Sequence, residues 1–361
     1  MAGPRQARQS PRWLWWATLV GVFVVGGVVG GVVSGAIVGT SSSSATDGST
    51  VTACPVTTVA RQVMPSMVTI SASGPGGGGT GSGEVIRSDG YILTNNHVIS
   101  VAAAAGGSVD VQFADGETVP ATIKGRDPQR DLAVLKVETS RRLQPIAMGS
   151  SPSVQVGQPV VAIGSPLGWT GTVTSGIVSA LDRTVQVPGE DDRSALLVDA
   201  VQTDASINPG NSGGALVDCA HRLIGVPTAG ATVPSPTGQS AGGSIGLGFA
   251  IPVDLAKTIA DEIIATGRVT NAFIGLQTVP ISPAGGPPVG LFVQAVSSGS
   301  PAAAAGLRRQ DVITSIDGAA ATNNIQLAEL TLTKSPGDTV SLGYDRAGHS
   351  SHVVVTLAAQ P

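Results

Sequence analysis

Aromatic residues are scarce in this chain. Phe, Trp and Tyr make up 3% of its 361 residues, whereas hydrophobic residues as a whole make up 42%. The core must therefore be built mainly from Val, Ala, Ile and Leu. The chain also holds 49 glycines and 24 prolines. So many turn-forming residues suit a mainly β protein better than a helical one. The length suggests two domains with additional segments.

Charge is also sparse. Charged residues make up 12% of the chain, and the net charge is −4. A nucleic-acid partner would need a basic face, and this balance argues against one. We find no metal-binding or cofactor-binding motif. Gly74, Gly76 and Gly79 match a nucleotide-binding spacing, but that site requires a helix directly afterwards, and residues 84–87 are predicted as a strand. We interpret the glycine run 74–83 as a mobile loop.

Residues 13–39 carry no charge at all. As a helix they would extend about 40 Å, which exceeds the roughly 30 Å hydrocarbon core of a membrane. Arg5, Arg8 and Arg12 precede them, without an acidic residue. The positive-inside rule then predicts a cytoplasmic N-terminus at 1–12, a transmembrane helix at 13–39 and export of everything after it. A cleavable signal peptide is the competing interpretation. Its apolar core is usually about 7–15 residues with an Ala-x-Ala-like exit, so we favour a retained anchor.

Cysteines are limited to two, Cys54 and Cys219. Export would permit a disulfide between them. Nothing in the sequence shows that they meet, so a bridge and two separate buried thiols stay equally open. Residues 40–55 are rich in small and polar residues, and we expect them to form a flexible linker.

A serine framed by glycines is the most informative motif. It stands in Asn208-Pro209-Gly210-Asn211-Ser212-Gly213-Gly214. A serine hydroxyl is a weak nucleophile unless a base takes its proton and N–H groups stabilise the resulting oxyanion. Glycines allow the tight turn that aims successive N–H groups into one small space. We expect an oxyanion hole from the N–H groups of Gly210 and Ser212, with Asn211 as a further donor.

A histidine and an aspartate stand at strand ends upstream of this serine. His97 closes the apolar run 91–99, and Asp131 opens the alternating run 132–137. Each is weak evidence alone, because a lone histidine is more often structural and an aspartate often belongs to a turn. The order His97, Asp131, Ser212 is that of chymotrypsin, not of subtilisin or the α/β-hydrolases. Together they predict Ser212 as nucleophile, His97 as general base and Asp131 as the orienting acid.

From about residue 56 to its end, the chain resembles the HtrA (high-temperature-requirement) family of serine proteases. Small departures occur at Ala215, where a proline is common, at Glu84, where an apolar residue is frequent, and at Gln310, where a glycine is usual. The resemblance rests on Gly81-Ser82-Gly83, Thr94-Asn95-Asn96-His97-Val98, Asp131-Leu132-Ala133-Val134-Leu135-Lys136, Gly164-Ser165-Pro166-Leu167-Gly168, Gln202-Thr203-Asp204, Asn208 to Gly214 and Gly246 to Pro252.

This resemblance implies a chymotrypsin/trypsin-like double β-barrel protease domain over 56–268 and one α+β PDZ domain over 270–358. The many short runs of β-forming residues in the first of these agree with it. It also implies assembly as a homotrimer. Residues 254–267 are predicted as a helix that closes the protease domain. Two further stretches, 184–195 and 228–244, are predicted as the activation and specificity loops.

The second domain should bind C-terminal peptides. Its Phe273-Ile274-Gly275-Leu276 segment matches the family's carboxylate-binding loop, and residues 325–333 should form the helix beside the groove.

Cleavage specificity can be partly predicted. Six residues before the nucleophile stands Ser206, where a trypsin carries an aspartate. Without that charge a basic side chain would enter the pocket unpaired. The family prefers small or medium aliphatic residues, and Ile224 and Val226 could line a pocket for them.

The sequence thus predicts a serine endopeptidase anchored in a bacterial cell membrane, with both domains outside the cytoplasm. Its substrates would be misfolded or regulatory proteins, in quality control or the envelope stress response, and peptides at the PDZ domain would modulate it. The alternative is a non-catalytic chaperone or PDZ scaffold, which the intact triad disfavours.

Overall fold

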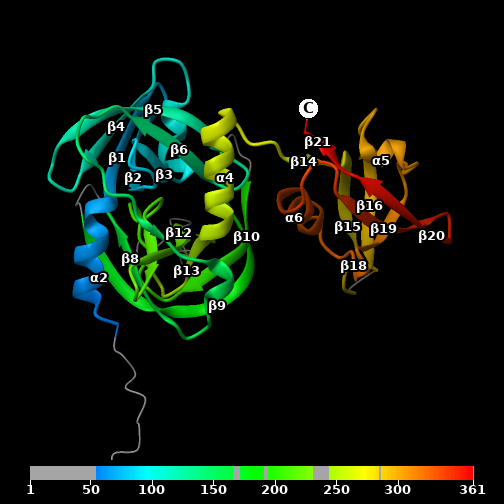
Figure 1. Cartoon of the computed structure of the whole chain (residues 1–361). Coiled ribbons are helices and arrows are strands. Elements are labelled where there is room, and N and C mark those ends of the chain that lie inside the picture. Colours follow the sequence, from blue (N-terminus) through cyan, green and yellow to red (C-terminus); the bar gives the residue numbers. More distant parts are fainter. Residues whose placement is uncertain (1–53, 166–170, 191–193, 231–243, 284–285, 361) are drawn as a thin grey trace, which may run out of the picture. The chain divides into compact units, whose positions relative to one another are not determined.

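The computed structural model (Figure 1) describes residues 54–165, 171–190, 194–230, 244–283 and 286–360. The chain divides into two units, residues 1–53 and 54–361. The predicted transmembrane helix at 13–39 therefore lies outside the described residues. Within the described ranges, no helix is both long enough and apolar enough to cross a membrane.

The first barrel is a closed sheet with strand order β1-β2-β3-β6-β5-β4. Its interior is aliphatic, as the composition predicts. Along β1, every second residue from Val68 to Ala72 points into this core, which is the two-residue period of a strand with one buried face. The strands are β1 (Met67–Gly74), β2 (Gly77–Val85), β3 (Tyr91–Thr94), β4 (Ser108–Phe113), β5 (Thr118–Asp127) and β6 (Leu132–Val137).

The second barrel comes from a seven-stranded sheet with order β11-β8-β9-β10-β13-β12-β7. An additional pairing of β11 with β12 closes this sheet on itself, and β7 stays outside the ring. The double β-barrel fold is therefore confirmed. The strands are β7 (Ala147–Met148), β8 (Pro159–Gly164), β9 (Thr172–Pro188), β10 (Ser194–Thr203), β11 (Ala215–Asp218), β12 (Arg222–Gly230) and β13 (Gly248–Pro252).

A 14-residue helix, α4 (Val253–Thr266), runs along both barrels (Figure 1). Ile259 and Ile263 pack into one apolar cluster with Leu132 of the first barrel and Val226 of the second. The helix ends at Gly267, whose φ of 80° only a glycine adopts easily. The structure thus agrees with the helix predicted at 254–267. The other helices of this domain are α2 (Val56–Val63) and α3 (Asn96–Ile99), with short 3-10 turns η1 (Met64–Ser66), η2 (Ser100–Ala102) and η3 (Ser151–Ser153).

The C-terminal domain has a core of its own. Its main sheet has the order β15-β16-β17-β19-β20, with β18 paired to β17, and β14 pairs with β21. The helix predicted at 325–333 is present with those bounds. The elements are β14 (Ala272–Phe273), β15 (Leu276–Ile281), β16 (Gly290–Val296), α5 (Pro301–Ala304), β17 (Val312–Ile316), β18 (Ala319–Ala320), α6 (Ile325–Thr333), β19 (Thr339–Arg346), β20 (His349–Thr356) and β21 (Ala358–Ala359).

Two expectations about loops were wrong. The glycine run 74–83 forms paired strand, because β1 and β2 make a hairpin that joins Gly74 to Gly77. Its glycines serve close packing, since a Cβ at Gly79 would lie 2.7 Å from the Val98 carbonyl oxygen. The predicted loop at 184–195 is mostly strand as well, because β9 continues to Pro188 and β10 begins at Ser194. The predicted loop at 228–244 begins as strand, and its part at 231–243 lies outside the described residues.

Candidate active site

His97 and Asp131 meet between the end of β3 and the start of β6. His97 Nδ1 lies 2.8 Å from Asp131 Oδ2, and the backbone N–H of His97 donates to Asp131 Oδ1 at 2.9 Å. The aspartate side chain is 3% exposed, whereas the histidine side chain is 40% exposed. The acid is thus held inside the protein, while the imidazole reaches the surface.

Asp131 stands in a left-handed backbone conformation with φ of 57°. Such a conformation is strained for a residue other than glycine. Its carbonyl oxygen accepts hydrogen bonds from the Asn96 N–H at 3.2 Å and from Asn95 Nδ2 at 2.8 Å. Asn95 Nδ2 also lies 2.8 Å from Thr228 Oγ1 on β12. Asn95 therefore fixes Asp131, the predicted catalytic acid, and joins it to the second barrel, a role that the sequence analysis missed.

Ser212 lies on the loop between β10 and β11. Its Oγ donates to the carbonyl oxygen of Thr228 at 3.2 Å, and within the described ranges it has no hydrogen bond to His97. Gly213, with φ of 75°, must be a glycine here, because a Cβ would come within 2.3 Å of Thr94 Oγ1. The serine loop of the second barrel is thus packed tightly against the strand that leads to His97.

The N–H groups of Gly210 and Ser212 donate to none of the described residues. Both are therefore available to an incoming oxyanion. Asn211 differs from expectation, because its backbone N–H donates to the carbonyl of Asn208 at 2.9 Å and its Nδ2 to that of Ser206 at 3.2 Å. The turn before the nucleophile closes on itself and consumes these donors, so the prediction of Asn211 as a further donor was wrong for this structure.

The predicted specificity residues do not form one group. Ser206 is half-buried, and its carbonyl accepts a hydrogen bond from Thr174 Oγ1 at 3.0 Å. Ile224 and Val226 are 1% and 0% exposed and belong to apolar clusters. These two residues build the core rather than line an open pocket.

Arg130, directly before Asp131, is a buried cation that the sequence analysis did not single out. Its guanidinium pairs with Asp127 Oδ2 at 2.7 Å. It also donates to Asn271 Oδ1 and twice to the carbonyl of Leu332, in α6, at 2.7 and 3.2 Å. The residue beside the predicted catalytic acid is therefore hydrogen-bonded to the last turn of a helix in the C-terminal domain.

The C-terminal domain has a groove beside α6. A cavity of about 460 Å³ is lined by the 273–276 segment and by Leu327, Ala328 and Thr331 of that helix, among others. Gly275 has φ of 81°, and a Cβ there would lie 2.2 Å from the Ser300 Cβ. The N–H groups of Ile274 and Gly275 donate to none of the described residues. A peptide carboxylate could accept from such groups.

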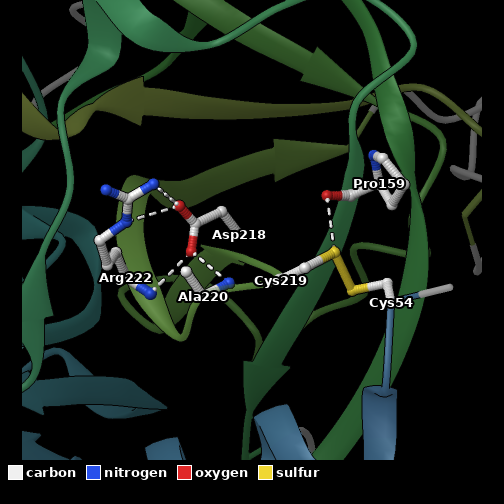
Figure 2. The surroundings of a disulfide bond; sticks show 6 residues. All are labelled: Cys54, Pro159, Asp218, Cys219, Ala220 and Arg222. Carbon is white, nitrogen blue, oxygen red and sulfur yellow. Dashed lines mark hydrogen bonds and ion pairs between the residues drawn. A yellow bond between two sulfur atoms is a disulfide. The ribbon is translucent and has the colours of Figure 1, made fainter. Parts of the chain in front are cut away.

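Cys54 and Cys219 form a disulfide, with their Cα atoms 5.2 Å apart (Figure 2). The turn that carries Cys219 is ordered by Asp218. Its Oδ1 accepts from the N–H groups of Ala220 and Arg222, both at 2.9 Å, and its Oδ2 pairs with the Arg222 guanidinium. The two cysteines lie next to β11 and α2, on the second barrel. Across the described ranges, no group of His, Cys, Asp or Glu is arranged to hold a metal ion.

The fold and the site define a trypsin-like peptidase domain followed by a PDZ domain. Residues 81–226 match the family model "Trypsin-like peptidase domain", and residues 272–357 match "PDZ domain". The solved structure of the HtrA-type protease AlgW with decapeptide is 31% identical. The match covers 85% of this chain and 99% of that chain, with a TM-score of 0.66. This chain belongs to the HtrA family.

Curated relatives agree with that membership. Serine protease PepD of Mycobacterium tuberculosis is 44% identical over 83% of this chain and 65% of its own length. The periplasmic pH-dependent serine endoprotease DegQ of Escherichia coli is 40% identical over 77% of this chain and 59% of its own length. This chain therefore spans less than two thirds of the length of each of these relatives.

Proposed function

We propose that this protein is a serine endopeptidase that cleaves misfolded or regulatory proteins outside the cytoplasm, in protein quality control. The observation that carries the proposal is the buried Asp131 carboxylate, which lies 2.8 Å from His97 Nδ1. The strand that leads to His97 packs against the Ser212 loop. Relatives named as periplasmic serine endoproteases support the same compartment.

The geometry supports the following chemistry. Asp131 accepts the Nδ1–H of His97, so Nε2 is the basic nitrogen of the neutral imidazole. Nε2 takes the proton of the Ser212 hydroxyl as its oxygen attacks the peptide carbonyl. The N–H groups of Gly210 and Ser212 stabilise the tetrahedral oxyanion. His97 then donates the proton to the leaving amine, and water hydrolyses the acyl-enzyme by the same route. Before each cycle, the Ser212 hydroxyl must turn away from the Thr228 carbonyl.

Substrate choice should follow from the absence of a pocket acid. With Ser206 in that position, a Lys or Arg side chain would lose its hydration without gaining a partner. We therefore expect cleavage after small or aliphatic residues. Mass spectrometry of casein digests tests this, and products that end mainly in Lys or Arg would contradict it.

The decisive experiment compares the wild type with Ser212→Ala on casein, with fluorophosphonate labelling of the serine in parallel. Loss of the triad serine of subtilisin costs on the order of 10⁶ in turnover, so the variant should be inactive while its thermal unfolding is unchanged. Loss of both cleavage and labelling in the Ser212→Ala variant would support the endopeptidase function. A wild type that neither cleaves nor becomes labelled would favour the non-catalytic chaperone or scaffold.

We also propose that peptides bound at the PDZ groove modulate cleavage. The free N–H groups of Ile274 and Gly275 and the hydrogen bonds of Arg130 to Leu332 support a route from groove to triad. A peptide raises activity only through its differential affinity for two states. Peptides with free apolar C-termini should bind and accelerate casein cleavage, and amidated versions should do neither. Arg130→Ala should keep binding but lose the acceleration. An equal response to free and amidated peptides would contradict this proposal.

Residues 13–39 are proposed as a single membrane-spanning helix of a bacterial cell membrane, with the N-terminus in the cytoplasm. The support is the uncharged run behind three arginines. A phosphatase reporter that works only outside the cytoplasm, fused after residue 45, should be active because the segment exports it. Sequencing of the mature N-terminus is the complementary measurement, because loss of residues 1–39 would identify a signal peptide instead. The proposed homotrimer is tested by light scattering of the purified exported part.

A further inference from the structure

A buried serine of the first barrel holds the catalytic loop of the second. Ser82, on β2, is 0% exposed. Its backbone N–H donates to the carbonyl of Ser212 at 2.9 Å. Its Oγ lies 2.6 Å from the carbonyl oxygen of Gly210, to which it donates, and 2.7 Å from the N–H of Ser165, from which it accepts. Ser82 therefore holds the loop on both sides of Asn211, at Gly210 through its hydroxyl and at Ser212 through its backbone N–H.

The direction of this hydroxyl is fixed by its neighbours. An N–H group can only donate and a carbonyl oxygen can only accept. The Ser165 N–H therefore occupies a lone pair of Ser82 Oγ, and the hydroxyl hydrogen must point at Gly210. In addition, the Ser82 carbonyl accepts from Thr94 Oγ1 at 2.7 Å, three residues before His97. The same residue is thus bonded to the histidine side and to the serine side of the site.

Gly210 is the point of the loop that most needs such a restraint. Its φ is 101°, and without a Cβ its backbone rotates over a wide range at little cost. Rotation about Gly210 would change the angle between its own N–H and that of Ser212, the two groups that face the oxyanion. Fixing the Gly210 carbonyl fixes the Gly210–Asn211 peptide plane and hence the relation between these two donors.

Packing alone does not require the hydroxyl. Ser82 is surrounded closely, since a Cβ on Gly214 would lie 3.1 Å from the Ser82 Cβ and one on Gly164 would lie 2.9 Å from its Oγ. An alanine would satisfy the shape of this site. What only the serine supplies is the bridge from the Ser165 N–H to the Gly210 carbonyl.

We propose that Ser82 is a positioning residue for the oxyanion hole. Its hydroxyl locks the Gly210–Asn211 peptide so that the N–H groups of Gly210 and Ser212 converge on one point. This inference rests on the proposed endopeptidase function and deepens it. It assigns the alignment of the second barrel's donors to a side chain of the first barrel, so the two halves of the fold must dock before the site is competent.

The test is Ser82→Ala in the full chain, with a chromogenic peptide substrate and a peptidyl boronic acid. The boronate becomes tetrahedral on the serine and places an oxygen in the oxyanion hole, whereas a substrate in the ground state depends on it less. Deletion of one oxyanion donor costs about 10²–10³ in kcat. Because misalignment keeps both donors, we expect kcat to fall by about tenfold to a hundredfold with KM nearly constant, and boronate affinity to weaken by a similar factor.

Two control variants separate positioning from general loosening. Ser71→Ala removes an exposed serine hydroxyl from the neighbouring strand β1 and leaves the bridge through Ser82 intact, so kcat should stay at the wild-type value. Ser82→Cys keeps the shape with a weaker donor and should fall between Ser and Ala. If Ser82→Ala does not fold, the Cys variant decides, and wild-type kcat in it would overturn the proposal.

The outcomes distinguish this inference from the function beneath it. A wild type that is inactive and is not labelled would contradict the proposed endopeptidase function itself. If the wild type is active and the folded Ser82→Ala variant has an equal or higher kcat, only the proposed role of Ser82 is contradicted. A loss that appears entirely in KM, with boronate affinity unchanged, would also overturn it, because a positioning residue of the oxyanion hole must act on the tetrahedral state.

Discussion

Glu84 is the least expected residue inside this protein. It is 0% exposed, and neither of its carboxylate oxygens has a hydrogen-bond partner among the described residues. Its cross-strand neighbours on β1 and β3 are Met67 and Leu93, which are both apolar. Burial raises the pKa of Glu84 well above its usual value, because the charged form loses its hydration and gains nothing in return. Burial therefore favours the protonated form of this side chain over the charged form.

This burial makes the stability depend on pH. Above about pH 4.3, an unfolded chain ionises this glutamate, whereas the folded chain keeps the proton. The free energy of unfolding is therefore highest below that pH, and it falls as the pH rises towards the higher pKa of the folded state. Glu84→Met should therefore raise the free energy of unfolding, by about 1–3 kcal/mol at neutral pH, and more at pH 8 than at pH 5.

Urea unfolding of Glu84→Met at these two pH values measures the effect. Glu138, whose side chain is 90% exposed, provides the control, because Glu138→Gln should follow the wild type at both. A Glu84→Met variant that is less stable than the wild type at pH 8 would show that the carboxyl has a partner in solution.

At the scale of single elements, β17 is flanked by two residues in left-handed conformations. Gln310 precedes it with φ of 76°, and Asp317 follows it with φ of 46°. Asp317 has local support, since its Oδ1 accepts from the Ser341 N–H at 2.8 Å. The Gln310 side chain makes no such bond to the described residues, although its N–H donates to the Val293 carbonyl. The resemblance to the family also predicts a glycine at position 310.

The two flanking positions should respond oppositely to glycine. A left-handed conformation costs a residue with a Cβ roughly 1–2 kcal/mol, so Gln310→Gly should stabilise the domain by about 1 kcal/mol after the entropic loss of a glycine. Asp317→Gly removes a hydrogen bond together with the strain and should destabilise or change nothing. Thermal unfolding of the two variants measures this, and a lower melting temperature for Gln310→Gly would contradict it.

Elements whose apolar residues recur at a regular spacing were predictable from the sequence, whereas close packing between elements was not. The helix observed at 253–266 followed from spaced apolar residues and a terminal glycine, whereas the helix at 325–333 followed from the resemblance to a PDZ domain. The glycine run 74–83 was misjudged because local propensity favours a turn, whereas contact with Val98 requires residues without side chains in a strand. Likewise, the residue types and order of His97, Asp131 and Ser212 were predictable. The bonds from Ser82 and Asn95 join residues far apart in sequence, and no local pattern reports them.

At the scale of the whole molecule, the disulfide covalently joins two distant parts of the sequence. It joins residues 165 positions apart, and the sequence left it open because spacing alone does not give the distance between two Cα atoms. Cross-linking mainly restricts the unfolded chain, and a native disulfide of this kind is worth about 2–5 kcal/mol. Cys54→Ala, Cys219→Ala and the double variant should therefore each lose about that much stability.

Urea unfolding with and without reductant measures this contribution. The double variant should unfold like the reduced wild type, which serves as its control. If reduction leaves the unfolding midpoint of the wild type in place, the two sulfurs are not bonded in the purified protein. A single variant less stable than the double would instead indicate damage by the remaining free thiol.

The disulfide also decides where mechanical load enters the protein. Cys54 stands two residues before the start of α2, whose Val59 and Val63 pack on Val161 and Val217 of the second barrel. In the membrane-anchored arrangement proposed above, any pull from the tether reaches Cys54 first. The covalent bond passes that pull straight to the turn after β11 and bypasses the helix. In a reduced molecule the same pull would peel α2 from the barrel, exposing its apolar face before the catalytic domain itself unfolds.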